Sequence, residues 1–310
     1  MAVDRPVSFG SRAAYVAYRA GGVVATRLPR SSARVLARTM GRALARAFPE
    51  RRRTVARHMR RVMGPDLEGA ALRRAVRDVF DSYARYWLEA FRLPTETPES
   101  IREAVRAEGL EHLEAAFAAG DGVVLAAPHL GGWDFGGAWL ALLGFKPFAV
   151  AEAVEPPELF EWFASWRRRL GVEVVPAGPD AGTAVLEAVR QGRTVGLVAD
   201  RDILGTGVEV EFFGETTTLP PGPAVLALRT GVPLLPCAIY FDGADHHRVV
   251  IRPPLEAARQ GRFREDVQRV TQALTHELED LIRAAPEQWH LLQPNWPSDP
   301  GWRHHKTPVS

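Results

Sequence analysis

A single cysteine stands among the 310 residues of the sequence, so no disulfide can form within the chain. Cys237 lies in the apolar run LLPCAIY, where a buried, inert thiol is a simpler interpretation than a nucleophile. The CxxC and HxxxH spacings that are typical of zinc sites are also absent from the sequence. The sequence therefore predicts neither a disulfide-stabilised fold nor a zinc centre of this kind.

Long apolar runs are scarce as well. The longest nearly uncharged run, residues 122–145, is interrupted by Pro128, a glycine pair and Asp134. The two remaining parts are too short to cross about 30 Å of hydrocarbon. The first thirty residues lack a clean apolar core followed by a small-residue cleavage site, so we expect no secretory signal peptide. We therefore expect a protein that is soluble or bound at the membrane periphery.

Acidic residues are nearly missing from the N-terminal part of the chain. Residues 1–63 contain fifteen arginines and no lysine, but only Asp4 and Glu50 as acids, which gives a charge of +13. Since the whole chain carries +2, the remaining residues sum to −11. A basic arm on an acidic body predicts an anionic partner, such as phospholipid headgroups, nucleic acid or an acidic ligand. No nucleic-acid-binding module is recognisable, so we expect an anionic membrane surface rather than nucleic acid.

Residues 31–48 have the pattern of an amphipathic helix. Arginines recur at every fourth position, and so do large apolar residues, and the two stripes are displaced by roughly 200° around the helix axis. In one interpretation the cationic face lies on anionic lipid. In the other the helix docks on its own domain and its arginines face solvent; the two are compatible if the helix docks at the rim of the active site. The stripes are Arg34, Arg38, Arg42 and Arg46, and Leu36, Met40, Leu44 and Phe48.

After residue 100, short apolar strands alternate with helices. This alternation predicts an α/β fold with a mostly parallel or mixed central sheet flanked by helices. We divide the chain into a basic amphipathic helical region at 1–100, an α/β core at 101–296 and a loosely ordered tail at 297–310. Strands are predicted at 122–127, 147–151, 172–176, 194–199, 208–213, 233–241 and 248–252. Helices are predicted at 68–92, 109–119, 133–143, 156–170, 180–191, 221–230 and 262–284.

The segment VVLAAPHLGGWDFGG at 123–137 predicts a catalytic histidine. An apolar strand ends at Pro128 and His129 follows, at the carboxyl edge of the sheet, where open α/β proteins bind ligands. Asp134 falls in the first turn of the next helix. Because the glycine pair allows a tight turn, Asp134 can accept the Nδ1 proton of His129 and leave Nε2 free to deprotonate a hydroxyl. The alternative for Asp134 is an ordinary residue of a helix N-terminus.

Polar residues also follow a second apolar strand. Asp200, Arg201 and Asp202 come directly after TVGLVA, so they too emerge at a strand's carboxyl end. An acidic pair that flanks a base can hydrogen-bond the hydroxyls of a polyol ligand, or it can support His129. The alternative is a plain surface loop.

Two more residues are candidates for a supporting role. Glu152 follows the predicted strand at 147–151, so the same topological argument applies to it. An oxyanion that forms during a reaction needs hydrogen-bond donors to stabilise it. Arg167, on the helical segment SWRRRL, is a candidate donor, and the alternative is that this helix face is simply solvated.

The run His129-Leu130-Gly131-Gly132-Trp133-Asp134 matches the HxxxxD motif of the glycerolipid and lysophospholipid acyltransferase superfamily. Over residues 68–296 the chain resembles the bacterial branch that contains the late lipid A acyltransferases and the phosphatidylinositol mannoside acyltransferases. The segment AEAVEPP around Glu152 and the arginines at 167–169 look more like the mannoside branch. The other matching stretches are, in order, GLEHL at 109–113, ADRD at 199–202, FFG at 212–214 with PGPA at 221–224, and PEQW at 286–289.

This resemblance implies an enzyme that moves a fatty acyl group from a thioester to a sugar or glycerol hydroxyl, with His129 as general base oriented by Asp134. It implies acyl-CoA as co-substrate, a phosphatidylinositol mannoside or related glycolipid as acceptor, no permanently bound cofactor or metal, and a peripheral location on the cytoplasmic face of the cell membrane. The lack of a GxSxG elbow agrees with a reaction without an acyl-enzyme. Two alternatives stay open: a lipid A or lysophospholipid acyltransferase that uses acyl carrier protein, and a catalytically silent lipid-binding protein.

Overall fold

A seven-stranded sheet forms the centre of the protein, as seen in the computed structural model, which describes residues 9–120 and 122–302. Its strand order is β1-β9-β8-β2-β5-β3-β4, and every neighbouring pair is parallel except β8 and β9. The predicted α/β class with a mostly parallel, mixed sheet is confirmed. The strands are β1 (Val105–Glu108), β2 (Val123–Ala127), β3 (Pro147–Ala151), β4 (Glu173–Pro176), β5 (Thr194–Val198), β8 (Leu234–Asp242) and β9 (His246–Ile251).

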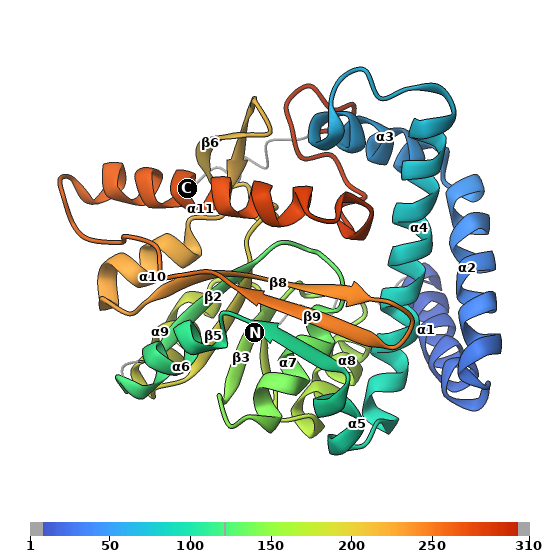
Figure 1. Cartoon of the computed structure of the whole chain (residues 1–310), viewed down its shortest axis with the longest axis horizontal. Helices are drawn as coiled ribbons and strands as arrows, with labels where there is room; N and C mark the ends of the chain where they lie inside the picture. The colour runs from blue at the N-terminus through green and yellow to red at the C-terminus, as the bar shows by residue number, and fades with distance from the viewer. Residues whose placement is uncertain (1–8, 121, 303–310) are drawn as a thin grey trace.

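Helices cover both faces of this sheet (Figure 1). Both faces of the sheet are apolar, because successive side chains of β2 point to opposite faces. Val124 and Ala126 pack into one apolar core, whereas Val123 and Leu125 pack into the other. The first core is shared with α9 (Ala181–Arg190), α10 (Gly222–Thr230) and α11 (Phe263–Arg283). The second is shared with α5 (Pro98–Glu103), α6 (Leu110–Ala118), α7 (Trp133–Leu142) and α8 (Pro157–Arg169).

A separate antiparallel hairpin consists of β6 (Val208–Phe212) and β7 (Glu215–Leu219). The sequence predicts β6 but not β7, whose ETTTL pattern is short and polar. Trp296 Nε1 donates a hydrogen bond of 3.1 Å to the carbonyl of Phe212. The hairpin is thereby joined to the C-terminal segment.

The N-terminal arm consists of α1 (Phe9–Arg27), α2 (Arg30–Ala47) and α3 (Pro49–Met63), all of which contact the long helix α4 (Gly69–Arg92) (Figure 1). Ala33 and Gly41 are the buried residues of α2. A Cβ atom at Gly41 would lie 2.6 Å from the carbonyl oxygen of Phe80, so the small side chains allow close helix packing. The predicted helices at 31–48 and 68–92 correspond to α2 and α4.

The two stripes of α2 have different environments. Arg34 donates to Asp245 at 2.8 Å and Arg42 to Asp81 at 3.2 Å, so two arginines of the cationic stripe bind the acidic body of the same chain. The apolar stripe is exposed instead, with Met40 at 53% and Phe48 at 46%. The structure agrees with the interpretation in which α2 docks on its own domain. The docked helix presents apolar as well as cationic side chains to solvent.

No helix within the described ranges combines the length and the apolar character that a bilayer span requires. The tail that the sequence predicts to be loosely ordered, 297–310, is described as far as Trp302. Asp299 in this tail is buried and hydrogen-bonded to α3, so this part of the tail is packed on the body of the protein. The remainder of the tail lies outside the described residues.

Candidate active site

The register between β2 and β5 brings His129 and Asp200 together. Ala127 pairs with Val198, and Ala199 N donates to Ala127 O at 2.9 Å, so the parallel ladder continues past the ends of both strands. His129 and Asp200 each lie two residues beyond this last pair. The segments that follow β2 and β5 therefore place His129 and Asp200 at the same point of the sheet's carboxyl edge.

His129 and Asp200 form a tight pair. His129 Nδ1 is 2.6 Å from Asp200 Oδ1, and the backbone N–H of His129 donates to Oδ2 of the same carboxylate at 3.0 Å. Trp289 Nε1 donates the third hydrogen bond to this carboxylate, to Oδ2 at 2.7 Å. Asp200 is fully buried, which by itself raises its pKa, but the charge and hydrogen bonds of His129 and the bond from Trp289 hold the pKa below its usual value.

An ionised Asp200 fixes the tautomer of the imidazole. The carboxylate accepts a hydrogen bond from Nδ1–H, so Nε2 of the neutral ring carries the free lone pair. The His129 side chain is 25% exposed, and within the described part of the chain its Nε2 has no hydrogen-bond partner. The indole of Trp133 lies edge-on to the ring at 5.7 Å between centroids. This arrangement can take a proton from a hydroxyl group.

Asp134 does not contact His129, which corrects the pairing expected from the HxxxxD spacing. Its carboxylate accepts hydrogen bonds from Tyr86 Oη at 2.8 Å and from Arg167 Nε and Nη2 at 2.7 and 3.1 Å. Gly131 explains this geometry, because its φ is +60° and a Cβ atom at this position would lie 1.9 Å from Ile239 O, which excludes other residues. The turn thus lies against Ile239 of β8, and Asp134 is directed toward Tyr86 of α4 and Arg167 of α8.

Asp134, Tyr86 and Arg167 form a buried cluster that joins α7, α4 and α8. Burial raises the pKa of the Tyr86 phenol well above its usual value, and the Asp134 charge adds to this. Burial alone would lower the pKa of Arg167, but the Asp134 carboxylate raises it, so the ion pair persists. Two nitrogens of Arg167 are engaged with Asp134, and its role as an oxyanion donor stays a prediction.

The other predicted site residues separate into two groups. Arg201 Nη1 lies 3.7 Å from Glu152 Oε2, so these two predicted residues meet at the sheet edge. Asp202 accepts the backbone N–H groups of Gly205 and Gly207, each at 2.8 Å, and shapes its own loop. No set of three or more His, Cys, Asp or Glu side chains in the described ranges could hold a metal ion.

Residues that the sequence analysis did not assign to the site also contact the pair. Trp289 belongs to the PEQW stretch, which carried the resemblance but no role. Asn295 Nδ2 donates to the backbone carbonyl of Asp200 at 3.1 Å. The backbone N–H of His290 donates to the carbonyl of His129 at 2.7 Å, and burial together with nearby His129 lowers the pKa of His290 to about 3.

Fold and site together define an α/β protein with a histidine–carboxylate pair at the carboxyl edge of its sheet. Cys237 is buried, and burial raises the pKa of its thiol to about 12, which agrees with an inert residue. The chain belongs to the family described as bacterial lipid A biosynthesis acyltransferase, whose family model matches residues 5–298. It is therefore an acyltransferase, and the resemblance found in the sequence is confirmed.

The chain is also similar to individual proteins that carry acyltransferase names. It is 41% identical to a phosphatidylinositol mannoside acyltransferase of Mycobacterium tuberculosis over 296 residues, which is 91% of this chain and 88% of the relative. It is 36% identical to the protein of that name from Mycolicibacterium smegmatis over 307 residues, 96% of each chain. A lipid A biosynthesis acyltransferase of Haemophilus influenzae is 28% identical over 188 residues, 58% of this chain and 55% of the relative.

Proposed function

We propose that this protein is a membrane-peripheral O-acyltransferase that transfers a fatty acyl group from acyl-CoA to a hydroxyl of a phosphatidylinositol mannoside or closely related glycolipid. The observation that carries the mechanism is the 2.6 Å contact between His129 Nδ1 and the buried Asp200 carboxylate. The acceptor class rests on the relatives that match at 36–41% identity over most of the chain.

In this mechanism His129 acts as general base. Nε2 takes the proton of the acceptor hydroxyl while the oxygen attacks the thioester carbonyl carbon, and Asp200 stabilises the resulting imidazolium. When the tetrahedral intermediate collapses, the C–S bond breaks and the proton passes from Nε2 to the departing CoA thiolate. The ester product and free CoA account for every atom, and no acyl-enzyme is needed.

The peripheral membrane location is supported by the arm. Exposed apolar residues lie mostly on α1 and α2 and at the α2–α3 junction, and both helices also contain arginines. A surface of this composition fits the boundary between headgroups and acyl chains of an anionic bilayer. The exposed large apolar residues there are Val16, Val23, Val24, Val35, Leu36, Met40, Leu44 and Phe48.

The lipid A alternative has weaker support, because the Haemophilus influenzae relative matches only 58% of this chain. The acyl donor is a separate question. An arginine-rich surface suits the phosphates of CoA and also the acidic surface of a carrier protein. Acyl-CoA is the donor that we propose, and acyl carrier protein is the comparison in the test.

The test is an acyl-transfer assay with defined substrates. Radiolabelled palmitoyl-CoA is incubated with the protein and, in parallel, with phosphatidylinositol mannosides, a lipid A precursor or a lysophospholipid; a second series uses palmitoyl-acyl carrier protein. We expect an acylated mannoside with palmitoyl-CoA and its loss in His129→Ala. Product analysis separates transfer from hydrolysis. Normal turnover by His129→Ala would refute the mechanism, and lipid binding without any transfer would favour the catalytically silent alternative.

A further inference from the structure

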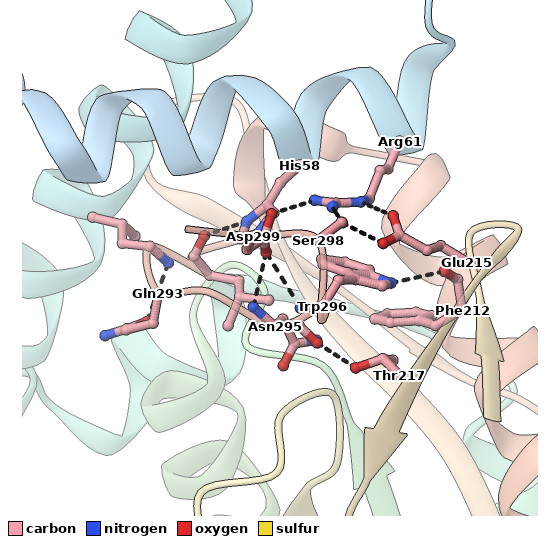
Figure 2. Close-up of polar contacts among 12 residues, drawn as sticks. His58, Arg61, Phe212, Glu215, Thr217, Gln293, Asn295, Trp296, Ser298 and Asp299 are labelled. Carbon is pink, nitrogen blue, oxygen red and sulfur yellow. Dashed lines mark hydrogen bonds and ion pairs between the residues drawn. The ribbon is translucent and has the colours of Figure 1, made fainter. Parts of the chain in front are cut away.

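Helix α3 of the N-terminal arm is joined to the C-terminal segment by a buried polar cluster (Figure 2). His58 and Arg61 point from α3 toward Asp299, and we call these three residues the α3 clasp. His58 Nε2 lies 3.3 Å from Asp299 Oδ2, and Arg61 Nη1 lies 3.0 Å from Asp299 Oδ1. The Arg61 guanidinium also covers the ring of Trp296 at 4.2 Å.

Asp299 fixes the backbone of the segment that precedes it. Its Oδ2 accepts the backbone N–H groups of Asn295 at 3.0 Å and Trp296 at 3.3 Å. Burial alone would raise the pKa of Asp299, but the hydrogen bonds from His58 and Asn295 and the charges of His58 and Arg61 hold it far below its usual range. An anionic Asp299 therefore accepts all these bonds at once.

From this segment two side chains reach Asp200. Asn295, whose backbone is held by Asp299, donates from Nδ2 to the Asp200 carbonyl at 3.1 Å. Trp289 donates from Nε1 to the Asp200 carboxylate at 2.7 Å, and its indole packs against the imidazole of His58 at 5.5 Å between centroids. His58 of α3 therefore contacts Trp289 directly, and it is connected to Asn295 through Asp299.

We propose that Asn295 and Trp289 are positioning residues that hold Asp200 against His129, and that the α3 clasp keeps them in place. This proposal rests on the proposed function, because it assigns a role in the same reaction. Asp200 has a short side chain and lies on the loop that follows β5. Its hydrogen bond with His129 Nδ1 forms only if the carboxylate is placed to within a few tenths of an ångström. Through the α3 clasp, Asn295 and Trp289, the arm that we expect at the membrane becomes a structural part of the active site.

The protein contains a matched control for the clasp. Asp266, in the first turn of α11, is also a buried carboxylate that accepts backbone N–H groups, from Gln260 and Gly261, and binds Arg259. Asp299→Asn and Asp266→Asn remove comparable bonds, so both should lower the melting temperature. Only Asp299→Asn should reduce kcat, by up to about 100-fold, while the KM for palmitoyl-CoA stays within about twofold.

Two further variants keep the test decisive if Asp299→Asn does not fold. Asn295→Ala should reduce kcat in the same way. Trp289→Phe keeps an aromatic ring but removes one donor from the Asp200 carboxylate, which then stabilises the protonated dyad more strongly. The acidic limb of the pH–rate profile should therefore move to higher pH; neighbouring His290, with a pKa of about 3, is neutral over that range.

The outcomes separate this proposal from the proposed function. A wild-type protein without acyl transfer would refute the proposed function before any variant is compared. If the wild type is active and Asp299→Asn, Asn295→Ala and Trp289→Phe all keep the wild-type kcat and pH–rate profile, the positioning proposal is refuted. If Asp266→Asn lowers kcat as much as Asp299→Asn does, the effect is one of general stability and the proposal also fails.

Discussion

The carboxylate that holds His129 comes from a residue 71 positions away in the chain, not from the aspartate five positions away. We therefore expect different effects from Asp200→Asn and Asp134→Asn: the first should lower kcat and the second should lower stability. Asp200→Asn should lower kcat by about 10⁴-fold, because an amide can leave the imidazole in the wrong tautomer. Its fold should persist, since the side-chain volume is unchanged.

Asp134→Asn should act mainly on stability. The variant leaves the Arg167 guanidinium without its anionic partner in a mostly buried site, which costs about 3–5 kcal/mol of unfolding free energy. Measuring kcat and the denaturant midpoint for both variants separates the two roles. A drop in kcat for Asp134→Asn as large as for Asp200→Asn, with unchanged stability, would show that Asp134 takes part in the chemistry.

His290 makes the stability of the protein depend on pH. Because burial lowers its pKa from 6.5 to about 3, the unfolded chain binds a proton at this residue between these values and the folded chain does not. Stability should therefore fall as pH decreases from 6.5, by about 2 kcal/mol at about pH 5. Urea unfolding at both pH values should show this loss, and His290→Gln should reduce it. An equal loss in the variant would assign the effect to other groups.

At the scale of elements, sequence periodicity was sufficient for most of the fold. The apolar runs of β2, β5 and β8 and the helical pattern of α4 and α11 are strong, and all appear where expected. The edge strand β1 was missed because VRAE is charged and mostly exposed. Helix α1 was missed because its glycine pair lowers helix propensity.

The active-site pairing required information that periodicity does not hold. His129 and Asp200 were both predicted at strand ends, but the sequence does not tell which strands are neighbours. β3 follows β2 in the chain, yet β5 lies between them in the sheet. Asn295 was not predicted either, because the segment after α11 has no regular pattern and its bonds depend on the packing of α3. Strand order and long-range packing therefore decide the site.

The close contact between α2 and α4 depends on Gly41. Gly41→Leu should separate the two helices, because even a Cβ atom would lie 2.6 Å from Phe80 O, and overpacking typically costs about 1–3 kcal/mol. Gly182→Ala on α9 is the control, since no atom lies within 4 Å of its added Cβ, and it should stabilise the protein by about 0.5–1 kcal/mol. Denaturant midpoints of both variants measure this. Equal stability of Gly41→Leu and wild type would mean that α2 is not held against α4 in solution.

At the scale of the whole molecule, the basic arm serves partly to bind the acidic body. Arg30 pairs with Glu96, Arg34 with Asp245 and Arg61 with Glu215, in addition to the Arg42–Asp81 pair. Arg61 is mostly buried, whereas the other three pairs are more exposed and contribute only about 0–1 kcal/mol each. Their combined effect is to fix the orientation of the arm, so that its exposed surface combines apolar side chains with arginines that form no ion pair among the described residues, such as Arg38 and Arg46.

This orientation allows the proposed binding of the arm to a bilayer to be tested. Met40→Ser combined with Leu44→Ser should lower the partition constant on vesicles of anionic lipid by about tenfold or more, because two apolar side chains no longer leave water. Arg38→Gln with Arg46→Gln should weaken binding mainly at low salt, since salt screens exposed charges. Leu143→Ser, at an exposed leucine of the α/β core, is the matched control and should bind like the wild type. Vesicle co-sedimentation at two salt concentrations measures all four proteins. If the Met40→Ser, Leu44→Ser protein binds like the wild type and the Arg38→Gln, Arg46→Gln protein does not bind, charge alone holds the arm on the membrane.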